Sequence, residues 1–509
     1  MFWLSVITAL SCGALFSAAL PGLGLWPLGL ALIPFFVVVA ESERSGQALG
    51  LGFSFGLGFF SLYMLWLPIS FAELFGQAAW VIYPPLVLLL SLFWGLVSWL
   101  SRLIGGRGTG TLWVLPALWV LLEWARTQGY FAFPWGSVGY LWVGTPLVQL
   151  ADIAGVYGLS LLTLAFAALV AAPFLERERS GRFTQERAPQ RWRPLLAAAL
   201  IAVAAGGYST YQLSRTLPLA TEQALLIQGN TDPLTGAIGG GRSVDLYTRL
   251  TERALEDLVN TPGYVIWPEG AVLSSDLEGP APNPDREQIA SSAGVATVIT
   301  GGSANIGGDR YNSVYSIAQG AQVTDRYDKL YLVPFGERWP FLERLEPLYR
   351  TVFGWFNLPL LRGTSPGDGA DPLDTPEARV AAYICYESVF PQVPRQMVAR
   401  GAEVLVNISN DAWFGRGRGA EQHFLMGTMR AVETRRYLLR VGNDGITAVV
   451  DPLGRVRDVL PRRVQQTLLV NYGFNDTVTP YVRFGDWLMI ALGVYTLGAT
   501  VTLVFSRSS

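Results

Sequence analysis

Apolar windows about as long as a bilayer is thick recur along this chain and limit what it can fold into. A membrane-spanning helix needs about 20 mainly apolar residues. Windows that approach or reach this length lie at 3–20, 25–40, 51–74, 79–100, 112–124, 157–175, 194–211 and 487–505. The composition agrees, because 51% of the 509 residues are hydrophobic and only 15% are charged. We therefore expect a polytopic α-helical membrane protein with about eight transmembrane helices.

Arginines in the short loops predict how the chain is oriented. Eight spans place both termini on one side of the membrane, and the opposite short loops carry Arg126. The loops and tail on the side of the termini carry Arg44, Arg102, Arg107, Arg177, Arg179, Arg182, Arg187, Arg191, Arg193 and Arg507. Because basic loops favour the cytoplasm, we expect both termini there. The long segment 216–483 then lies outside, which in a bacterium is the periplasm.

That long segment has the pattern of an α/β domain. Short apolar runs typical of buried strands lie at 224–228, 264–267, 296–300, 380–384 and 404–407, and helical patterns lie at 243–260, 391–400 and 421–439. We predict three domains: a seven-span bundle at 1–213, a catalytic domain at 214–484 and a last transmembrane helix at 485–509.

Lys329 stands out by composition. The chain has 37 basic residues, and Lys329 is the one lysine, which leaves 36 arginines. A general drift from Lys to Arg in the genome explains the 36 arginines. It leaves the one remaining lysine to be explained either by chance or by a functional requirement. Arginine cannot replace a compact ammonium or one that must lose a proton, so we interpret Lys329 as a functional residue.

The scarce Cys and His residues exclude several kinds of site. Cys12 lies in an apolar stretch and Cys385 lies far from it in the chain, so no disulfide framework is expected. His423 is the single histidine, so a Ser-His-Asp triad would have to use it, and a His-rich metal site is impossible. We expect no metal and no cofactor. A net charge of −2 gives no basic footprint, so nucleic acid is not an expected partner.

Two further residues with chemistry lie where strands end. Cys385 follows the apolar run 380–384 and is followed by Tyr386 and Glu387. Glu269 ends the run Val-Ile-Trp-Pro-Glu. Each has an ordinary alternative, a buried structural thiol and a solvated turn carboxylate. Together with Lys329 they supply what acyl transfer requires: a nucleophile, a general base and a cation that stabilises the thiolate and an oxyanion.

The local context of these residues resembles a known superfamily. Trp267, Pro268 and Glu269, then Lys329 within Tyr-Asp-Lys and Leu-Val-Pro-Phe-Gly-Glu337, then Cys385-Tyr386-Glu387, resemble the Glu-Lys-Cys pattern of the nitrilase, or carbon-nitrogen hydrolase, superfamily. With membrane spans on both sides, the chain resembles the apolipoprotein N-acyltransferase family. The segments 123–135, 228–230, 311–313, 407–415 and 422–424 agree, so the resemblance covers nearly the whole chain.

The resemblance implies a nitrilase-like α-β-β-α sandwich on a bundle of membrane helices in the bacterial inner membrane. Cys385 would take an acyl chain from the sn-1 ester of a phospholipid, typically phosphatidylethanolamine, as a thioester. The α-amine of the N-terminal diacylglyceryl-cysteine of an apolipoprotein would then accept it. The resemblance further implies that Glu337 supports Lys329 or the intermediate, and that Tyr386 and Glu387 orient the nucleophile. We expect the enzyme to act as a monomer.

Two residues depart from the family pattern. Gly270 stands where Ser or Thr is expected after the glutamate, and Asp444 stands where the family often has a neutral residue. Neither belongs to the predicted triad. They bear on the hydrogen bonding around Glu269 and near the donor site.

Several aromatic residues are predicted to face lipid or substrate. The segment 341–361, next to Lys329 and Glu337, is interpreted as an apolar arm that dips into the outer leaflet and covers the site, with an ordinary core helix as the alternative. A second loop lies at 413–415. The predicted lipid-facing or substrate-facing residues are Trp267, Phe341, Tyr349, Phe353, Trp355, Phe356, Trp413 and Phe414.

His423 and four arginines receive structural roles. His423 lies in a predicted helix among apolar residues, so packing or hydrogen bonding is favoured over a role as base. Arg430, Arg435, Arg436 and Arg440 are interpreted as a solvated helix face, with lipid phosphate as the alternative partner.

Two other function classes stay open at this point. A membrane-tethered amidase or nitrilase would use the same triad with water as acceptor. A transporter or receptor is disfavoured, because its spans would be expected to carry more ionisable groups at the bilayer midplane.

Overall fold

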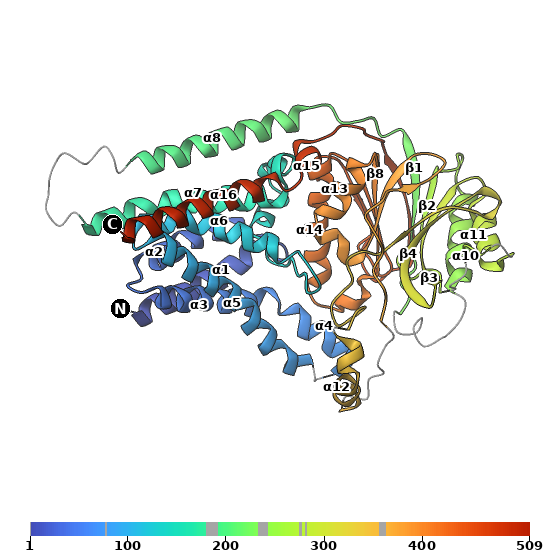
Figure 1. Cartoon of the computed structure of the whole chain (residues 1–509). Helices are drawn as coiled ribbons and strands as arrows, with labels where there is room; N and C mark the ends of the chain where they lie inside the picture. The colour runs from blue at the N-terminus through green and yellow to red at the C-terminus, as the bar shows by residue number, and fades with distance from the viewer. Residues whose placement is uncertain are drawn as a thin grey trace.

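The computed structural model describes residues 2–76, 79–179, 192–232, 243–273, 277–279, 282–339, 341–355 and 363–508. Figure 1 shows a bundle of helices beside an α/β domain. The first helix begins and the last helix ends at the same end of the bundle, away from the α/β domain (Figure 1). The chain therefore leaves the bundle for the α/β domain and returns to it.

The bundle is built from the N-terminal helices and the last helix of the chain. Its members are α1 (Phe2–Ala19), the 3-10 helix η1 (Trp26–Ala31), α2 (Leu32–Glu41), α3 (Ser45–Tyr63), α4 (Trp66–Phe75), α5 (Ala79–Gly105), α6 (Thr109–Ala125), α7 (Ala151–Arg179), α8 (Arg193–Ser214) and α16 (Trp487–Ser508). Two short 3-10 helices, η3 (Val138–Trp142) and η4 (Pro146–Leu150), lie between α6 and α7.

Length and apolarity qualify several of these helices as membrane spans. Four are long enough alone: Phe2–Ala19, Ala79–Gly105, Pro146–Leu175 and Arg193–Ser214. The predicted single window 51–74 is instead a pair, Ser45–Tyr63 and Trp66–Ala72, bent by 41°. The windows at 25–40, 112–124 and 487–505 correspond to shorter apolar helices, which are Trp26–Glu41, Thr109–Ala125 and Trp487–Thr502.

Glycines let the first bundle helices touch backbone to backbone. A Cβ on Gly13 of α1 would lie 2.0 Å from the carbonyl oxygen of Phe55, and a Cβ on Gly58 of α3 would lie 2.1 Å from that of Leu10. Small residues at such crossings bring helices close enough to gain van der Waals contact where lipid offers no hydrophobic driving force. The sequence of α1 and α3 therefore fixes their close contact.

The α/β domain contains two six-stranded sheets. The first has the order β12-β1-β2-β3-β4-β5 and the second β11-β10-β9-β8-β7-β6. The first comprises β1 (Glu222–Gln228), β2 (Tyr264–Ile266), β3 (Thr297–Ile306), β4 (Asp309–Ala318), β5 (Gln322–Asp328) and β12 (Gln466–Tyr472). The second comprises β6 (Leu373–Asp374), β7 (Arg379–Ile384), β8 (Val404–Ser409), β9 (Leu438–Gly442), β10 (Ala448–Val450) and β11 (Val456–Val459).

Helices cover the outer face of each sheet. In Figure 1, α10 (Ser243–Glu256) and α11 (Pro284–Ala293) lie on one side, and α13 (Gln392–Ala399) and α14 (Gly419–Thr434) lie on the other. Alternate residues of β1 serve the two faces: Leu225 packs with the α10 and α11 cluster, and Leu226 packs with the core between the sheets. The layer order of the predicted nitrilase-like fold, an α-β-β-α sandwich, is therefore confirmed.

Two expectations about the domain are wrong. The helix predicted at 421–439 ends at Thr434, because Arg435 takes a left-handed φ of 55° and the chain then enters β9. The four arginines of this region are not a solvated face, since all four are buried. Arg435, for example, forms an ion pair with Asp152 of α7 at 2.6 Å. Arg440 of β9 likewise forms an ion pair, with Asp411 at 2.6 Å.

Trp267 is also not a lipid-facing residue. Its side chain is fully buried in the core between the first sheet and α10. Its indole N–H donates to Thr251 Oγ1 at 3.0 Å, and its ring stacks on Tyr247 with centroids 5.4 Å apart. The prediction failed because a tryptophan at the end of a strand can point to either face of the sheet.

Candidate active site

The two sheets bring the three predicted site residues to one place. Glu269 follows β2, which pairs in parallel with β1 and β3. Cys385 directly follows β7, which pairs in parallel with β8 and lies next to the edge strand β6. Lys329 directly follows β5, whose partner β4 carries Asn312. The Lys329 backbone N–H donates to the Asn312 carbonyl oxygen at 2.8 Å, which fixes where the lysine leaves the sheet.

Lys329 lies between two carboxylates. Its Nζ is 2.8 Å from Glu337 Oε1 and 3.4 Å from Glu269 Oε1, and its side chain is only 1% exposed. Burial lowers the pKa of Lys329, but the Glu337 and Glu269 carboxylates outweigh it and hold the pKa above its ordinary value. The lysine is therefore an ammonium at neutral pH, which is the form that stabilises an oxyanion.

Glu269 is held by groups that sequence reasoning did not assign. Asn312 Nδ2 donates to Glu269 Oε1 at 2.8 Å and to Glu337 Oε1 at 2.9 Å. The backbone N–H of Asn410 donates to Glu269 Oε2 at 2.9 Å. Both asparagines belong to segments that agree with the family pattern, which was the available signal. Sequence position alone could not reveal that they meet one carboxylate.

Cys385 occupies a sharp turn at the end of β7. Its φ is 49°, a left-handed value that is uncommon for a residue with a Cβ and is found at functional sites. Burial raises the pKa of the Cys385 thiol, Glu269 raises it further, and Lys329 opposes both. The thiol is therefore protonated at rest, so a nucleophilic thiolate needs a base at the moment of reaction.

Glu387 connects the turn at Cys385 to the first sheet. Its Oε1 accepts hydrogen bonds from Tyr327 Oη at 2.6 Å and from the Leu330 backbone N–H at 2.7 Å. Its Oε2 accepts from the Ile384 backbone N–H at 2.8 Å. The carboxyl is fully buried, and burial raises the pKa of Glu387. The geometry gives it an orienting position that connects the strand end before Cys385 with the segment of Lys329.

Tyr386 connects the turn at Cys385 to the bundle. Its hydroxyl donates to the Ala132 carbonyl oxygen at 2.9 Å, in the loop after α6. Its ring stacks on Trp135 of the same loop, with centroids 6.2 Å apart and planes 14° apart. The residue next to Cys385 is thus in direct contact with the bundle part of the chain.

His423 contacts the backbone of Cys385. Its Nε2 lies 3.0 Å from the Cys385 carbonyl oxygen and 2.8 Å from Ser388 Oγ, and its Nδ1 lies 3.2 Å from Asp411 Oδ1. Asp411 in turn pairs with Arg440 at 2.6 Å. The order Ser388, His423, Asp411 has the contacts of a hydrolase triad, but all three side chains are buried. Burial lowers the pKa of His423 and keeps the ring neutral, as a positioning group requires.

The predicted lipid-facing residues divide into exposed and packed ones. Phe341 is 63% exposed and stacks on Tyr130 of the bundle loop, and Tyr349 of α12 (Leu342–Trp355) packs against Trp339. Phe414 of the 3-10 helix η8 (Asp411–Phe414) instead packs against Trp66 of α4. Trp413 in the same turn is half-buried. Phe356 and the side chains of Phe353 and Trp355 lie outside the described residues.

The two departures from the family pattern have local explanations. Gly270 has a φ of 72°, a left-handed value that favours glycine, so serine or threonine here would be strained. Asp444 pairs with Arg462 at 2.5 Å, so its charge has a partner. The Glu269 carboxylate itself is held by Asn312 and Asn410.

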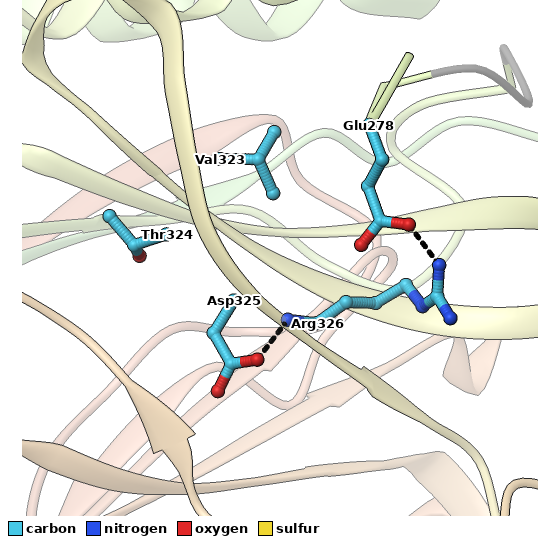
Figure 2. Close-up of a pocket in the computed structure, with 5 residues that line it drawn as sticks. All are labelled: Glu278, Val323, Thr324, Asp325 and Arg326. Carbon is cyan, nitrogen blue, oxygen red and sulfur yellow. Dashed lines mark hydrogen bonds and ion pairs between the residues drawn. The ribbon is translucent and has the colours of Figure 1, made fainter. Parts of the chain in front are cut away.

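A surface hollow on the first sheet is separate from this site. Figure 2 shows its lining residues, which are Glu278, Val323, Thr324, Asp325 and Arg326. Arg326 pairs there with Glu278 and also with Asp328, so its charge is already neutralised. Within the described part of the chain, no group of three or more His, Cys, Asp or Glu side chains could hold a metal ion.

Comparison with known proteins identifies both parts of the chain. Residues 12–169 match the family model of the apolipoprotein N-acyltransferase N-terminal domain, and residues 264–477 match that of carbon-nitrogen hydrolase. A solved amidase of the nitrilase superfamily from Nesterenkonia aligns with 54% of this chain and 99% of its own, at 17% identity and a TM-score of 0.39.

Curated relatives extend the match to nearly the full length. The apolipoprotein N-acyltransferase of Geobacter metallireducens is 31% identical over 99% of this chain and 96% of its own. Those of Nitrosomonas europaea and Methylococcus capsulatus are both 32% identical, over 95% and 92% of this chain and 94% and 89% of their own. The chain therefore belongs to the apolipoprotein N-acyltransferase family.

Proposed function

We propose that this chain transfers an acyl chain from the sn-1 position of a phospholipid, with phosphatidylethanolamine as the expected donor, to the α-amine of the N-terminal diacylglyceryl-cysteine of apolipoproteins. Cys385 carries the acyl chain as a thioester between two half-reactions. The observation that carries this proposal is the hydrogen-bonded group of Glu269, Lys329 and Glu337. This group lies where β2 ends before Glu269 and where β7 ends before Cys385.

In the first half-reaction, Glu269 accepts the thiol proton of Cys385. The sulfur attacks the ester carbonyl carbon, and the Lys329 ammonium stabilises the oxyanion that forms. When the tetrahedral intermediate collapses, the ester C–O bond breaks and the protonated Glu269 returns its proton to the leaving glyceryl oxygen. The products are a thioester on Cys385 and a lysophospholipid.

In the second half-reaction, the acceptor amine attacks the thioester carbon. Glu269 takes a proton from the amine, Lys329 again stabilises the oxyanion, and the C–S bond breaks. The sulfur of Cys385 leaves and regains a proton through Glu269, which completes the cycle. Glu337 keeps Lys329 in place, and Tyr386 and Glu387 orient the nucleophile turn.

We further propose the membrane arrangement. The chain comprises a seven-span bundle at 1–213, a catalytic domain at 214–484 in the periplasm and a last span at 485–509, with both termini in the cytoplasm. It acts as a monomer in the bacterial inner membrane. The basic loops and the eight apolar helical segments support this arrangement. Phe341, Tyr349, Phe353, Trp355, Phe356 and Trp413 are the proposed lipid contacts.

A membrane-tethered amidase that uses water as acceptor is the competing function. The bond from Tyr386 to the Ala132 carbonyl favours the transferase, because an enzyme for soluble amides has no need to dock its nucleophile turn on a membrane bundle. Water exclusion also matters, since an exposed thioester would hydrolyse before it met an amine.

Intact-mass spectrometry of the purified full chain in phosphatidylethanolamine vesicles tests the proposal. We expect one acyl group on Cys385 that hydroxylamine removes, and its transfer to a diacylated lipopeptide when that is added. Cys385→Ala should show no adduct, whereas Cys12→Ser, which changes the other cysteine, should behave as wild type. Free fatty acid as the sole product in the presence of lipopeptide would establish the amidase-type hydrolase instead.

A further inference from the structure

Arg338 lies where the site segment meets the bundle. It closes the turn that begins at Val333, since the Phe335 N–H donates to the Arg338 carbonyl oxygen at 2.8 Å. The preceding residue, Glu337, is the nearer carboxylate of Lys329. The Arg338 guanidinium carbon lies 3.8 Å above the ring centre of Tyr130, in the bundle loop after α6. One side chain thus bridges the catalytic turn and the bundle.

The charge of Arg338 has no acidic partner among the residues that the structure describes, although its side chain is half-buried. A guanidinium stacked on an aromatic face still has its in-plane N–H groups available. Those N–H groups match the spacing of two phosphate oxygens, which arginine binds in a bidentate manner. The Tyr130 ring therefore presents a cation that is ready for a phosphate.

Exposed apolar side chains lie beside the Arg338–Tyr130 contact, because Phe341 stacks on Tyr130 and Phe335 packs against Phe131, each with ring centroids 6.4 Å apart. Phe131 is 55% exposed, Phe335 54% and Phe341 63%. Leu345 and Leu348 of α12 continue the exposed surface. Together these five side chains form what we call the apolar rim. A cation set in an apolar surface suits a ligand with one anionic group and hydrocarbon chains, and it suits a free anion poorly.

The backbone conformation of two residues in the apolar rim is typical of a ligand site. Phe335 has a φ of 62° and Phe341 a φ of 53°, left-handed values that are strained for large side chains. The two lie on either side of Arg338 in the chain. Strain of this kind persists where the surroundings demand it, commonly at ligand sites. Here it accompanies two phenylalanine rings that are largely exposed beside the guanidinium.

We propose that Arg338, stacked on Tyr130, binds the phosphate of the phospholipid donor, while the apolar rim holds its acyl chains. This rests on the proposed function and specifies how the donor is recognised. Because Arg338 directly follows Glu337, a phosphate held there leaves the glyceryl esters of the same lipid near Lys329. The acceptor lipopeptide needs no phosphate, so Arg338 serves only the first half-reaction.

Binding measured without turnover tests the proposal. In a Cys385→Ala background of the full chain, we expect a short-chain phosphatidylethanolamine to bind roughly ten- to a hundredfold more weakly when Arg338→Gln is added, the loss of a charge-assisted hydrogen bond. Arg338→Lys should restore part of the affinity. Diacylglycerol of the same chain length, which lacks the phosphate, should bind both proteins equally.

Arg344→Gln is the matched control, since Arg344 is an exposed arginine of the adjacent α12. It should leave phosphatidylethanolamine binding unchanged. Equal affinity of the Arg338→Gln and Arg344→Gln proteins, or an equal loss for diacylglycerol, would overturn the phosphate site. Absence of a Cys385 adduct in the enzyme with an intact Cys385 would overturn the proposed function, and the binding result would stand apart from it.

Discussion

The ammonium of Lys329 lies 2.8 Å from Glu337, closer than the 3.4 Å that separates it from Glu269. Glu337 thus carries most of the pairing with the lysine. This leaves Glu269, which Asn312 and Asn410 hold in place, available to exchange protons. The two carboxylates of the site can therefore be separated by experiment.

We predict that Glu269→Gln slows acyl-enzyme formation about 10²- to 10⁴-fold, the range for loss of a general base. Glu337→Gln should slow acyl-enzyme formation less, roughly 10- to 100-fold. Lys329 then has Glu269 as its remaining carboxylate partner, and this stronger pairing makes Glu269 a weaker base. Single-turnover intact mass measures both. Glu346→Gln, which removes an exposed carboxylate paired with Arg350, should have no effect. A wild-type rate for Glu337→Gln would contradict its supporting role.

The raised pKa of Cys385 predicts how the thiol responds to pH. Below that pKa the thiolate fraction rises about tenfold per pH unit, so alkylation by iodoacetamide should increase steadily from pH 7 to pH 9 without levelling. Burial and Glu269 raise the pKa and Lys329 lowers it. Glu269→Gln should therefore speed alkylation at a given pH, and Lys329→Met should slow it.

Peptide mass spectrometry separates Cys385 from Cys12 in this measurement. The informative result is the opposite sign of two effects in Glu269→Gln, which should alkylate faster and transfer acyl groups more slowly. Slower alkylation of that variant would show that Glu269 favours the thiolate before substrate binds.

His423 is predicted to position the nucleophile without exchanging protons with substrate. His423→Leu should lose the hydrogen bond to the Cys385 carbonyl and slow acyl-enzyme formation by about 10- to 100-fold, as expected for a lost buried hydrogen bond. The lipid concentration at half-saturation should stay the same. His423→Gln keeps an N–H donor and should restore part of the rate. A pH profile that loses its acid-side inflection in His423→Leu would instead indicate a base.

Trp267 and Trp413 are predicted to differ in their effect on stability. Trp267→Ala empties a fully buried site and should lower the free energy of unfolding by about 3–5 kcal/mol. Trp413→Ala removes a half-buried ring and should cost less than about 1 kcal/mol. Thermal unfolding in detergent measures the difference. Equal effects would place Trp267 outside the core.

Local patterns in the sequence were sufficient for the apolar helices, the central strands and the order of Glu269, Lys329 and Cys385. An apolar run reveals a helix or a strand because burial acts on neighbours in the chain. Glu269 and Cys385 could be singled out because each directly follows an apolar run, but they follow strands of different sheets, and the sequence did not show how those sheets pack. The bend between α3 and α4 lies within one apolar run and left no such signal.

What only the tertiary structure decided are the contacts between distant segments. Trp267 lies two residues before Glu269 in the chain, yet its ring enters the core while the Glu269 carboxylate contacts Lys329. Asn410 and His423 reach the site through backbone and ring atoms from elements more than 20 residues beyond Cys385. Arg435, directly after α14, is buried with its charge paired because α7 supplies Asp152 as a partner. Sequence periodicity records which residues avoid water, but the partner that a buried polar group finds depends on how the layers pack.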